Sequence, residues 1–399
     1  MKKKFFRLGP GILITAAFIG PGTLTVCTIV GVNSGTSLLW AILFSVIITI
    51  ITQNIAAKIS LKTKKGLAQV LINYSNTPLK KWFMLMLLIS AIFLGNSAYE
   101  AGNITGAKIG LEQIIGSKVI YFSGVDFLPI IICLLISIIY LMGSSELIKK
   151  LLLFFVVLIS FSFVFAAIIT KPDVLSVLNG LLIPRFDLSE LALVISLIGT
   201  TIVPYNLFLH SALIKNISHK IDYKQIKNDT IISVSIGGLI SFCIVLAAAN
   251  SGLKSVESVS DLGIALSPIY GEFSKYLISI GLFGAGISSA ITAPLAASYV
   301  VSECFGWKIK ENKAKFIFLF VLVSGTIFSS LDINPIVIIQ LAQLFNGLLL
   351  PIIGVFLLLL VTSNKLKNYF NNQYLIKIIL TIILVSYMFL GLKNLGLFF

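Results

Sequence analysis

The stretch FIGPGTLTVC, residues 18–27, interrupts an apolar segment of helix length near the N-terminus. Pro21 has no amide hydrogen and its ring clashes with the preceding turn, while Gly20 and Gly22 weaken a helix further. A second break occurs at Pro204, within GTTIVPYNLFLHS at residues 199–211. Irregular backbone at membrane depth is tolerated where it lies inside the protein or lines a cavity. The two breaks therefore predict an internal binding site.

The composition is that of an integral membrane protein. Of the 399 residues, 57% are hydrophobic and 11% are charged, and the mean hydropathy is +1.04. Apolar runs such as LPIIICLLISIIYLMG (128–143) have helix length, and the ten-residue alternation of a membrane β-barrel is absent. The opening MKKKFFR leads into a first helix that we expect to be retained, because further spans follow directly. The predicted class is all-α.

Hydropathy and helix breakers divide the chain into eleven predicted spans within one transmembrane domain, residues 1–399. The spans cover about residues 9–30, 37–58, 82–110, 127–143, 147–170, 190–213, 230–252, 274–303, 315–331, 335–362 and 373–392. We expect the connections at 59–81, 171–189 and 253–273 to be loops with short surface helices.

The order of the spans predicts two inverted repeats, at about 9–170 and 190–362, followed by an extra helix at about 373–392. Each half contains five spans, and since five is odd, the second half enters the membrane upside down. The broken spans 1 and 6 are the first members of the two halves. Interrupted helices at matching positions of inverted repeats are typical of the central site of a secondary transporter.

The net charge of +15 follows the predicted topology. The basic residues gather at the N-terminus (four) and in alternate connections: six at 58–81, two at 149–150, four at 215–227, four at 308–315 and three at 365–377. These 23 of 30 Lys and Arg residues predict a cytoplasmic N-terminus and an extracytoplasmic C-terminus in a plasma or inner membrane. The partner is then the lipid bilayer, and no nucleic acid is needed to explain the charge. The four cysteines have no metal-site or disulfide spacing, and nothing in the sequence indicates an oligomeric state.

Span 3 carries the one acidic residue that we place well inside the bilayer, Glu100. With Asn96, Tyr99 and Asn103 it forms an i, i+3, i+4, i+7 pattern, which places four polar groups on one helix face. An acid inside a membrane is costly, so it indicates function, as a group that binds either a proton or a cation. The alternatives are a protonated structural hydrogen-bond donor or a carboxylate in an outer vestibule.

Several stretches resemble the Nramp family of divalent-metal transporters, which have the leucine-transporter (LeuT) fold. They are LGPGILITAAFIGPG and SLLW at span 1, KISLKTKKGLAQV after span 2, PYNLFLHSAL in span 6, GISSAITAPLAASYVVSECFGW in span 8, and Gln343 ahead of LLLP in span 10. The resemblance covers nearly the whole chain. It implies helices 1 and 6 broken around a cation site, and cation transport without a resident cofactor; the coupling to protons stays open.

The chain departs from the family at the residues that hold metal. The family's Asp-Pro-Gly-Asn reads Gly20-Pro21-Gly22-Thr23, and its Met-Pro-His reads Val203-Pro204-Tyr205. The carboxylate, the amide and the soft thioether are therefore missing. The family's Asp and Glu of span 3 align with Glu100 and Asn103, and the arginine of span 9 has no counterpart in residues 316–330. Thr201, His210 and Gln343 are retained.

The resemblance to the family and the departures from it together give the predicted site. The predicted substrate-binding residues are Gly20, Gly22, Thr23, Thr200, Thr201, Val203, Tyr205, Gln343 and Asn346. Gly20, Thr23, Gln343 and Glu100 are the predicted metal ligands, and Glu100, Asn103 and His210 are predicted to couple transport to protons or cations. For His210, a structural hydrogen bond is an equal alternative. For Gln343 and Asn346, the alternative is hydrogen bonding between helices.

Two functions remain open from the sequence. The first is secondary transport of a hard divalent cation, Mg²⁺ or partly hydrated Mn²⁺, because oxygen donors suit such ions. The second is transport of an organic or anionic solute, which the missing carboxylate at the breaks favours and Glu100 opposes. A receptor or scaffold would need a soluble domain, and an enzyme a nucleophile or ligand cluster, and the sequence contains neither.

Overall fold

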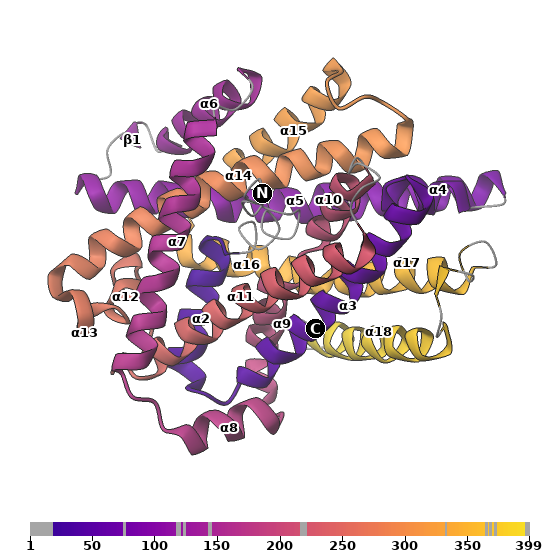
Figure 1. Cartoon of the computed structure of the whole chain (residues 1–399). Coiled ribbons are helices and arrows are strands. Elements are labelled where there is room, and N and C mark those ends of the chain that lie inside the picture. The colour runs from indigo at the N-terminus through magenta and orange to yellow at the C-terminus, as the bar shows by residue number, and fades with distance from the viewer. Residues whose placement is uncertain are drawn as a thin grey trace, which may run out of the picture.

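The computed structural model describes residues 19–74, 77–116, 121–122, 125–142, 146–215, 222–331, 333–363, 366, 369–370 and 373–395. Within these ranges the protein is helical apart from one short antiparallel hairpin, in which β1 (Tyr121–Phe122) pairs with β2 (Val125–Asp126). The first half of the predicted span 1 lies outside the described residues. Figure 1 shows the helices crossing one another around a common interior.

The helices follow the predicted order of spans. They are α2 (Pro21–Ser34), α3 (Leu39–Thr63), α4 (Leu67–Tyr74), α5 (Pro78–Ile115), α6 (Leu128–Leu141), α7 (Glu146–Ile169), α8 (Val174–Leu182), η1 (Leu188–Glu190), α9 (Leu191–Thr201), α10 (Pro204–Lys215), α11 (Tyr223–Ala249), α12 (Val259–Ile264), α13 (Ser267–Tyr270), η2 (Gly271–Phe273), α14 (Ser274–Phe305), α15 (Asn312–Ser329), α16 (Pro335–Leu348), α17 (Leu350–Thr362) and α18 (Gln373–Leu395).

Seven helical segments in the described part of the chain are long and apolar enough to cross a membrane. An eighth is added if Phe154–Ile169 and Val174–Leu182, which meet at a bend of 120°, count as one span. Leu128–Leu141 and Ile376–Ser386 are apolar but shorter. The protein is thus a multi-span helical membrane protein, and the total of eleven spans stays a prediction.

Both predicted breaks coincide with the start of a helix. α2 begins at Pro21, after an extended Gly20. α9 ends at Thr201 and α10 begins at Pro204, so the predicted span 6 is divided into two half-helices. Proline suits the first helical position, where the amide hydrogen it lacks would have no partner inside the helix. The predicted span 335–362 is also divided, at Leu349, and this break was not predicted from the sequence.

α5 lies at the centre of the packing, against α14, α15 and α16 (Figure 1). Three of its glycines allow neighbouring helices to approach closely. A Cβ at Gly102 would lie 3.0 Å from Ala342 of α16, one at Gly106 would lie 2.3 Å from Pro21, and one at Gly110 would lie 2.5 Å from the Ser279 carbonyl. Larger side chains would force these helices apart.

Of the short helices in the connections, only some lie on the surface. α8 is mostly exposed, as expected. α4 is not a surface helix, because Leu67, Ala68, Val70 and Leu71 are buried. Its first amide, on Leu67, donates to the Ser211 hydroxyl of α10 at 2.5 Å, so hydrogen bonding as well as burial holds this connection inside the fold.

Candidate functional site

Gln343 of α16 lies between the two broken helices. A Cβ on Gly22 of α2 would lie 2.0 Å from the Gln343 Nε2 atom, and one on Gly199 of α9 would lie 2.1 Å from the Gln343 carbonyl oxygen. Asn346 donates from Nδ2 to Gln343 Oε1 at 3.4 Å, and both side chains are buried. The structure thus brings together three of the predicted site residues, Gly22, Gln343 and Asn346.

Gly20 faces α5 and α14 instead. A Cβ at Gly20 would lie 3.0 Å from Ser289 Oγ and 3.6 Å from the Tyr99 hydroxyl. The Tyr99 ring meets the Tyr205 ring edge-on, with centroids 5.2 Å apart. Tyr99 therefore links the break in span 1 to the break in span 6. Ser289, which was not among the predicted site residues, borders this part of the site.

The threonines of the site are buried on the two broken helices. Thr200 donates from its hydroxyl to the Leu197 carbonyl at 2.7 Å, and its oxygen lies 3.4 Å from the Thr201 hydroxyl oxygen. Thr23 is 2% exposed, within the first turn of α2. A hydroxyl that donates its hydrogen to its own helix keeps oxygen lone pairs that can accept a hydrogen bond or bind a cation.

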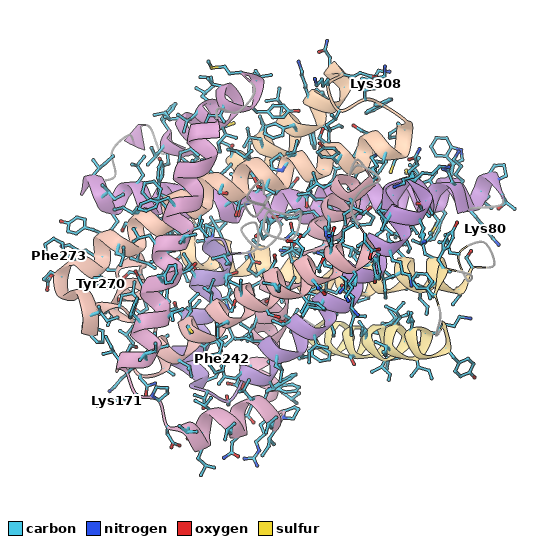
Figure 2. All side chains as sticks on the ribbon, viewed as in Figure 1. Lys80, Lys171, Phe242, Tyr270, Phe273 and Lys308 are labelled. Carbon is cyan, nitrogen blue, oxygen red and sulfur yellow. The ribbon has the colours of Figure 1, made fainter. Side chains whose placement is uncertain are left out.

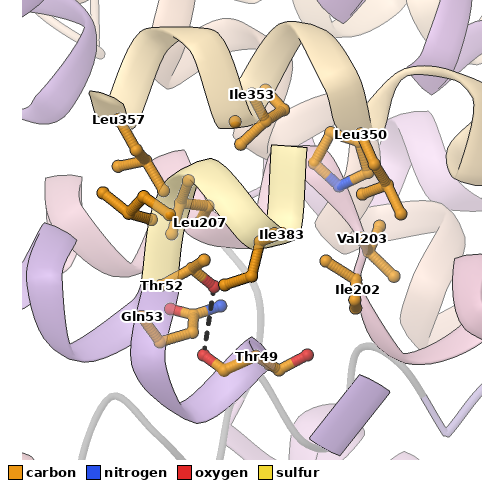
Figure 3. Close-up of a pocket in the computed structure, with 13 residues that line it drawn as sticks. Thr49, Thr52, Gln53, Ile202, Val203, Leu207, Leu350, Ile353, Leu357 and Ile383 are labelled. Carbon is orange, nitrogen blue, oxygen red and sulfur yellow. Dashed lines mark hydrogen bonds between the residues drawn. The ribbon is translucent and has the colours of Figure 1, made fainter. Parts of the chain in front are cut away.

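Val203 lines a small cavity that none of the other predicted site residues borders. Thr49 and Gln53 of α3 and Ile383 of α18 line it too, together with residues of α10 and α17 (Figure 3). Its volume is about 20 Å³, which is room for about one water molecule. The cavity borders the break in span 6 and lies between α3, α17 and α18.

Glu100 of α5 is fully buried and packs against α15. Its Oε2 accepts from Asn103 Nδ2 at 3.3 Å, and its Oε1 has no hydrogen-bond partner. A Cβ at Gly325 of α15 would lie 2.5 Å from Glu100 Cγ, so that glycine is what lets α15 cover the acid. No sequence pattern marked Gly325, because its importance comes from a contact between distant segments.

The polar residues of α5 do not share one neighbour. Asn96 donates to the Ala293 carbonyl of α14 at 3.1 Å, Tyr99 faces Gly20 and Tyr205, and Glu100 packs against α15. A face spanning i to i+7 covers a wide arc, and α5 is enclosed on several sides. The predicted face is therefore divided among three contacts.

His210 of α10 is fully buried, and its Nδ1 lies 2.5 Å from Gln53 Oε1 of α3. Its Nε2 has no partner. Gln53 was not among the residues predicted from the sequence. The available signal was a pair of amide residues, Gln53 and Asn54, inside an otherwise apolar span.

A second buried acid, Glu303, was also missed, because it lies at the end of the predicted span 274–303. It is 7% exposed, and its Oε1 accepts from the Lys215 ammonium at 2.6 Å. The carboxylate rests against Gly66, just before α4. Glu100 is therefore not the only buried acid in a long apolar helix of this chain.

A site made of several acidic, histidine or cysteine ligands is absent from the part of the chain that the structure describes, where no three such side chains gather. The atoms available to bind a cation at the broken helices are carbonyl, hydroxyl and amide oxygens. Such neutral oxygens suit hard cations that keep part of their water shell, and they suit soft transition metals poorly.

The family model described as "Natural resistance-associated macrophage protein-like" matches residues 11–396. The chain belongs to the Nramp family. It is accordingly a multi-pass membrane transporter and not an enzyme.

The sequence identity to two relatives shows that the chain is a distant member of the family. The Natural resistance-associated macrophage protein 2 homolog of Dictyostelium discoideum is 27% identical over 96% of the chain, which spans 62% of that relative's length. The divalent metal cation transporter MntH of Bacillus subtilis is also 27% identical, over 90% of the chain and 84% of its own length.

Solved structures share the fold. A manganese transporter of Eremococcus coleocola, crystallised in a mutant form, matches with a TM-score of 0.78 and 20% identity, over 99% of this chain and 88% of its own. MhsT in complex with L-phenylalanine matches with a TM-score of 0.60 and 15% identity, over 96% and 98%. The predicted LeuT-like fold is confirmed.

Proposed function

We propose that this Nramp-family protein is a secondary active transporter that moves a hard divalent cation, Mg²⁺ or Mn²⁺, coupled to protons. The observation that carries the proposal is the position of Gln343, whose amide packs on Gly22 between the two broken helices. Its Nε2 faces Gly22, and its Oε1, which accepts a hydrogen bond from Asn346, is the neutral oxygen that it offers as a ligand. The names of relatives, MntH of Bacillus subtilis among them, support a divalent cation as cargo.

The proposed ligands are oxygen atoms only. They are the Gly20 carbonyl, the Thr23 and Thr201 hydroxyls, and the amides of Gln343 and Asn346. A hard cation prefers such ligands, and Mg²⁺ in particular keeps several waters. With Val203 in place of a thioether, selection for softer metals is lost. Neutral ligands also bind a hydrated cation weakly enough for it to leave again, as transport requires.

Glu100 supplies the proposed proton coupling. Its free Oε1, in a buried setting, can take up a proton or face a cation. Because one carboxyl cannot hold both at once, binding of one favours release of the other. Asn103 orients the carboxyl through its hydrogen bond, and His210 is the proposed proton acceptor on the path towards the cytoplasm.

We place the N-terminus in the cytoplasm and the C-terminus outside. In Figure 2, Lys308 and Lys80, from connections that we assign to the cytoplasm, lie at the upper right and at the right edge. Lys171 and Phe273, from connections assigned to the outside, lie at the lower left and at the left edge. The separation of these two groups supports the assignment from the positive-inside rule.

Transport of an organic or anionic solute is the second candidate. It is favoured by the residues at the breaks, none of which is acidic, and by the two half-helices α2 and α10 that begin there. The N-terminus of a helix carries a partial positive charge and attracts anions. MhsT, a protein of similar fold, was solved with L-phenylalanine.

Calorimetry on the purified protein and uptake into proteoliposomes test the proposal, each with Mg²⁺, Mn²⁺ and Ca²⁺. We expect binding and uptake of Mg²⁺ or Mn²⁺ by the wild type, and no uptake by Glu100→Gln, which cannot ionise. Glu112→Gln, the same change nearer the end of α5, is the control and should transport normally. No heat with any of the three cations would favour the second candidate, and normal uptake by Glu100→Gln would remove the acid from the mechanism.

A further inference from the structure

Asn206 is buried without hydrogen bonds from its side chain. It is the third residue of α10, one turn from the break, and its backbone amide donates to the Val203 carbonyl at 3.1 Å. Its side chain is 1% exposed, and neither Nδ2 nor Oδ1 has a protein partner. In the part of the chain that the structure describes, no other side chain leaves two buried polar atoms unpartnered.

A buried amide side chain without hydrogen bonds lowers the stability of the folded state. Most buried polar atoms in proteins are hydrogen-bonded, and those that are not destabilise the folded state. Asn96 shows the usual arrangement, since it is equally buried and donates to the Ala293 carbonyl at 3.1 Å. Leucine would fill the space of Asn206 without that cost. The amide at this position therefore indicates a use other than stability.

Asn206 shares a helix face with His210. The two residues are four positions apart, which places their side chains about 6 Å apart on neighbouring turns. His210 Nε2 is buried and unpartnered as well. Three unpartnered polar atoms thus follow one face of α10, leading away from the break and towards Lys215 at the other end of the helix.

We infer that Asn206 binds the water shell of the cargo cation as the cation leaves the broken helices along this face of α10. Water bound to a cation donates its hydrogens, and Asn206 Oδ1 is an acceptor for one of them, while Nδ2 donates to a second water. An amide binds such a shell without the charge that would trap the cation. The inference rests on the proposed function, because it takes a hydrated divalent cation as the cargo.

Cysteine labelling tests whether Asn206 faces the pathway. In a chain whose four native cysteines are replaced by serine, Asn206→Cys and Ala212→Cys are treated with a membrane-impermeant methanethiosulfonate from each side. Both positions are buried, but the helical repeat turns Ala212 away from the Asn206 and His210 face. We expect modification of Asn206→Cys from the cytoplasmic side, slowed by Mg²⁺ or Mn²⁺, and no modification of Ala212→Cys. No modification at 206, or equal rates at both positions, overturns the inference.

Uptake by the wild type in the same vesicles separates the two proposals. If the wild type takes up neither cation, the proposed function fails, whatever the labelling shows. If the wild type transports and neither cation slows the labelling at position 206, only the role of Asn206 fails.

Leucine substitution gives a second, independent measurement. Asn206→Leu removes two unpartnered polar atoms, so we expect Tm to rise by about 2 °C or more. We expect kcat/KM for uptake to fall roughly tenfold, the effect of losing one hydrogen bond to a charged group. Asn96→Leu is the matched control, and its Tm should fall. A fall in Tm for Asn206→Leu as large as that of Asn96→Leu, with uptake unchanged, would overturn the inference.

Discussion

Gln343 contacts both broken helices, with its side chain on Gly22 and its carbonyl oxygen against Gly199. One residue of α16 thus packs against both α2 and α9. Because the approach at both glycines is closer than any Cβ allows, the contact depends on glycine at these two positions. The site is therefore sensitive to the addition of a single methyl group.

Gly22→Ala should abolish cation uptake. The new Cβ would lie 2.0 Å from Gln343 Nε2, so the amide has to leave its position between the helices. Overpacking of this kind costs about 1–3 kcal/mol and moves the ligand out of the site. Uptake and Tm of the purified variant measure both effects.

Gly20→Ala is the comparison for this variant. Its Cβ would lie 3.0 Å from the Ser289 hydroxyl, a contact that a small adjustment relieves. We expect partial uptake and little change in Tm. If Gly22→Ala transported as well as Gly20→Ala, Gln343 would not be held at the site as described.

Gly325→Ala should reduce uptake as strongly as Glu100→Gln does, although it adds no charge and touches no proposed ligand of the cation. Its Cβ would lie 2.5 Å from Glu100 Cγ and 2.8 Å from the Glu100 backbone carbon, so α15 or the acid must move. Gly354→Ala is the matched control in another helix, where the nearest atom is 3.2 Å away, on the flexible Leu384 side chain. Equal uptake by the two variants would contradict a role for the packing around Glu100.

The positions of the helix breaks could be predicted from the sequence, because proline acts locally. Pro21 and Pro204 each begin a helix in the structure, as their lack of an amide hydrogen dictates. Gln343 was also identified as a site residue. What no local pattern contains is its contact with Gly22, since the two residues are more than 300 positions apart.

The other contacts around the site could not be predicted for the same reason. The bond between His210 and Gln53 joins residues 157 positions apart, and the pair of Lys215 and Glu303 joins residues 88 apart. Hydropathy placed Glu303 at the end of a span, where an acid is expected to meet water. Only the packing of α10 and α4 against α14 removes it from solvent.

Stability of α8 should depend on pH through its cap. Asp173 accepts from the Ser176 hydroxyl at 2.6 Å and from the Ser176 amide at 2.9 Å, and these bonds hold the pKa of the Asp173 carboxyl below its usual range. A group whose pKa is lower in the folded state stabilises the fold above its unfolded pKa, about 3.9. That contribution is lost as the pH falls through the folded value. Amide protection factors in α8 should therefore decrease on acidification.

Two substitutions separate the cap from its charge. Asp173→Asn keeps a good cap acceptor that does not titrate, so the pH dependence should disappear while protection remains. Asp173→Ala should lower protection at every pH. A pH dependence that persisted in Asp173→Asn would assign the effect to another group.

Removing Lys215 and removing Glu303 from their ion pair should lower the stability of the protein by different amounts. Glu303 is almost fully buried, whereas the Lys215 side chain is 22% exposed. Lys215→Met leaves a buried carboxylate without its cation, which costs about 3–5 kcal/mol. Glu303→Gln leaves an ammonium that still reaches water, so its cost should be smaller. Thermal unfolding of the two variants in the same detergent gives the comparison.

The double variant Lys215→Met with Glu303→Gln tests whether Lys215 stabilises the protein by neutralising the buried carboxylate of Glu303. With neither charge present, no unpaired ion remains inside the protein, and a glutamine at 303 can still accept hydrogen bonds. We therefore expect its Tm to lie above that of Lys215→Met alone, although it carries one more substitution. If the two losses simply added, Lys215 would not compensate the charge of Glu303, and the link between α10 and α14 would rest on apolar packing alone.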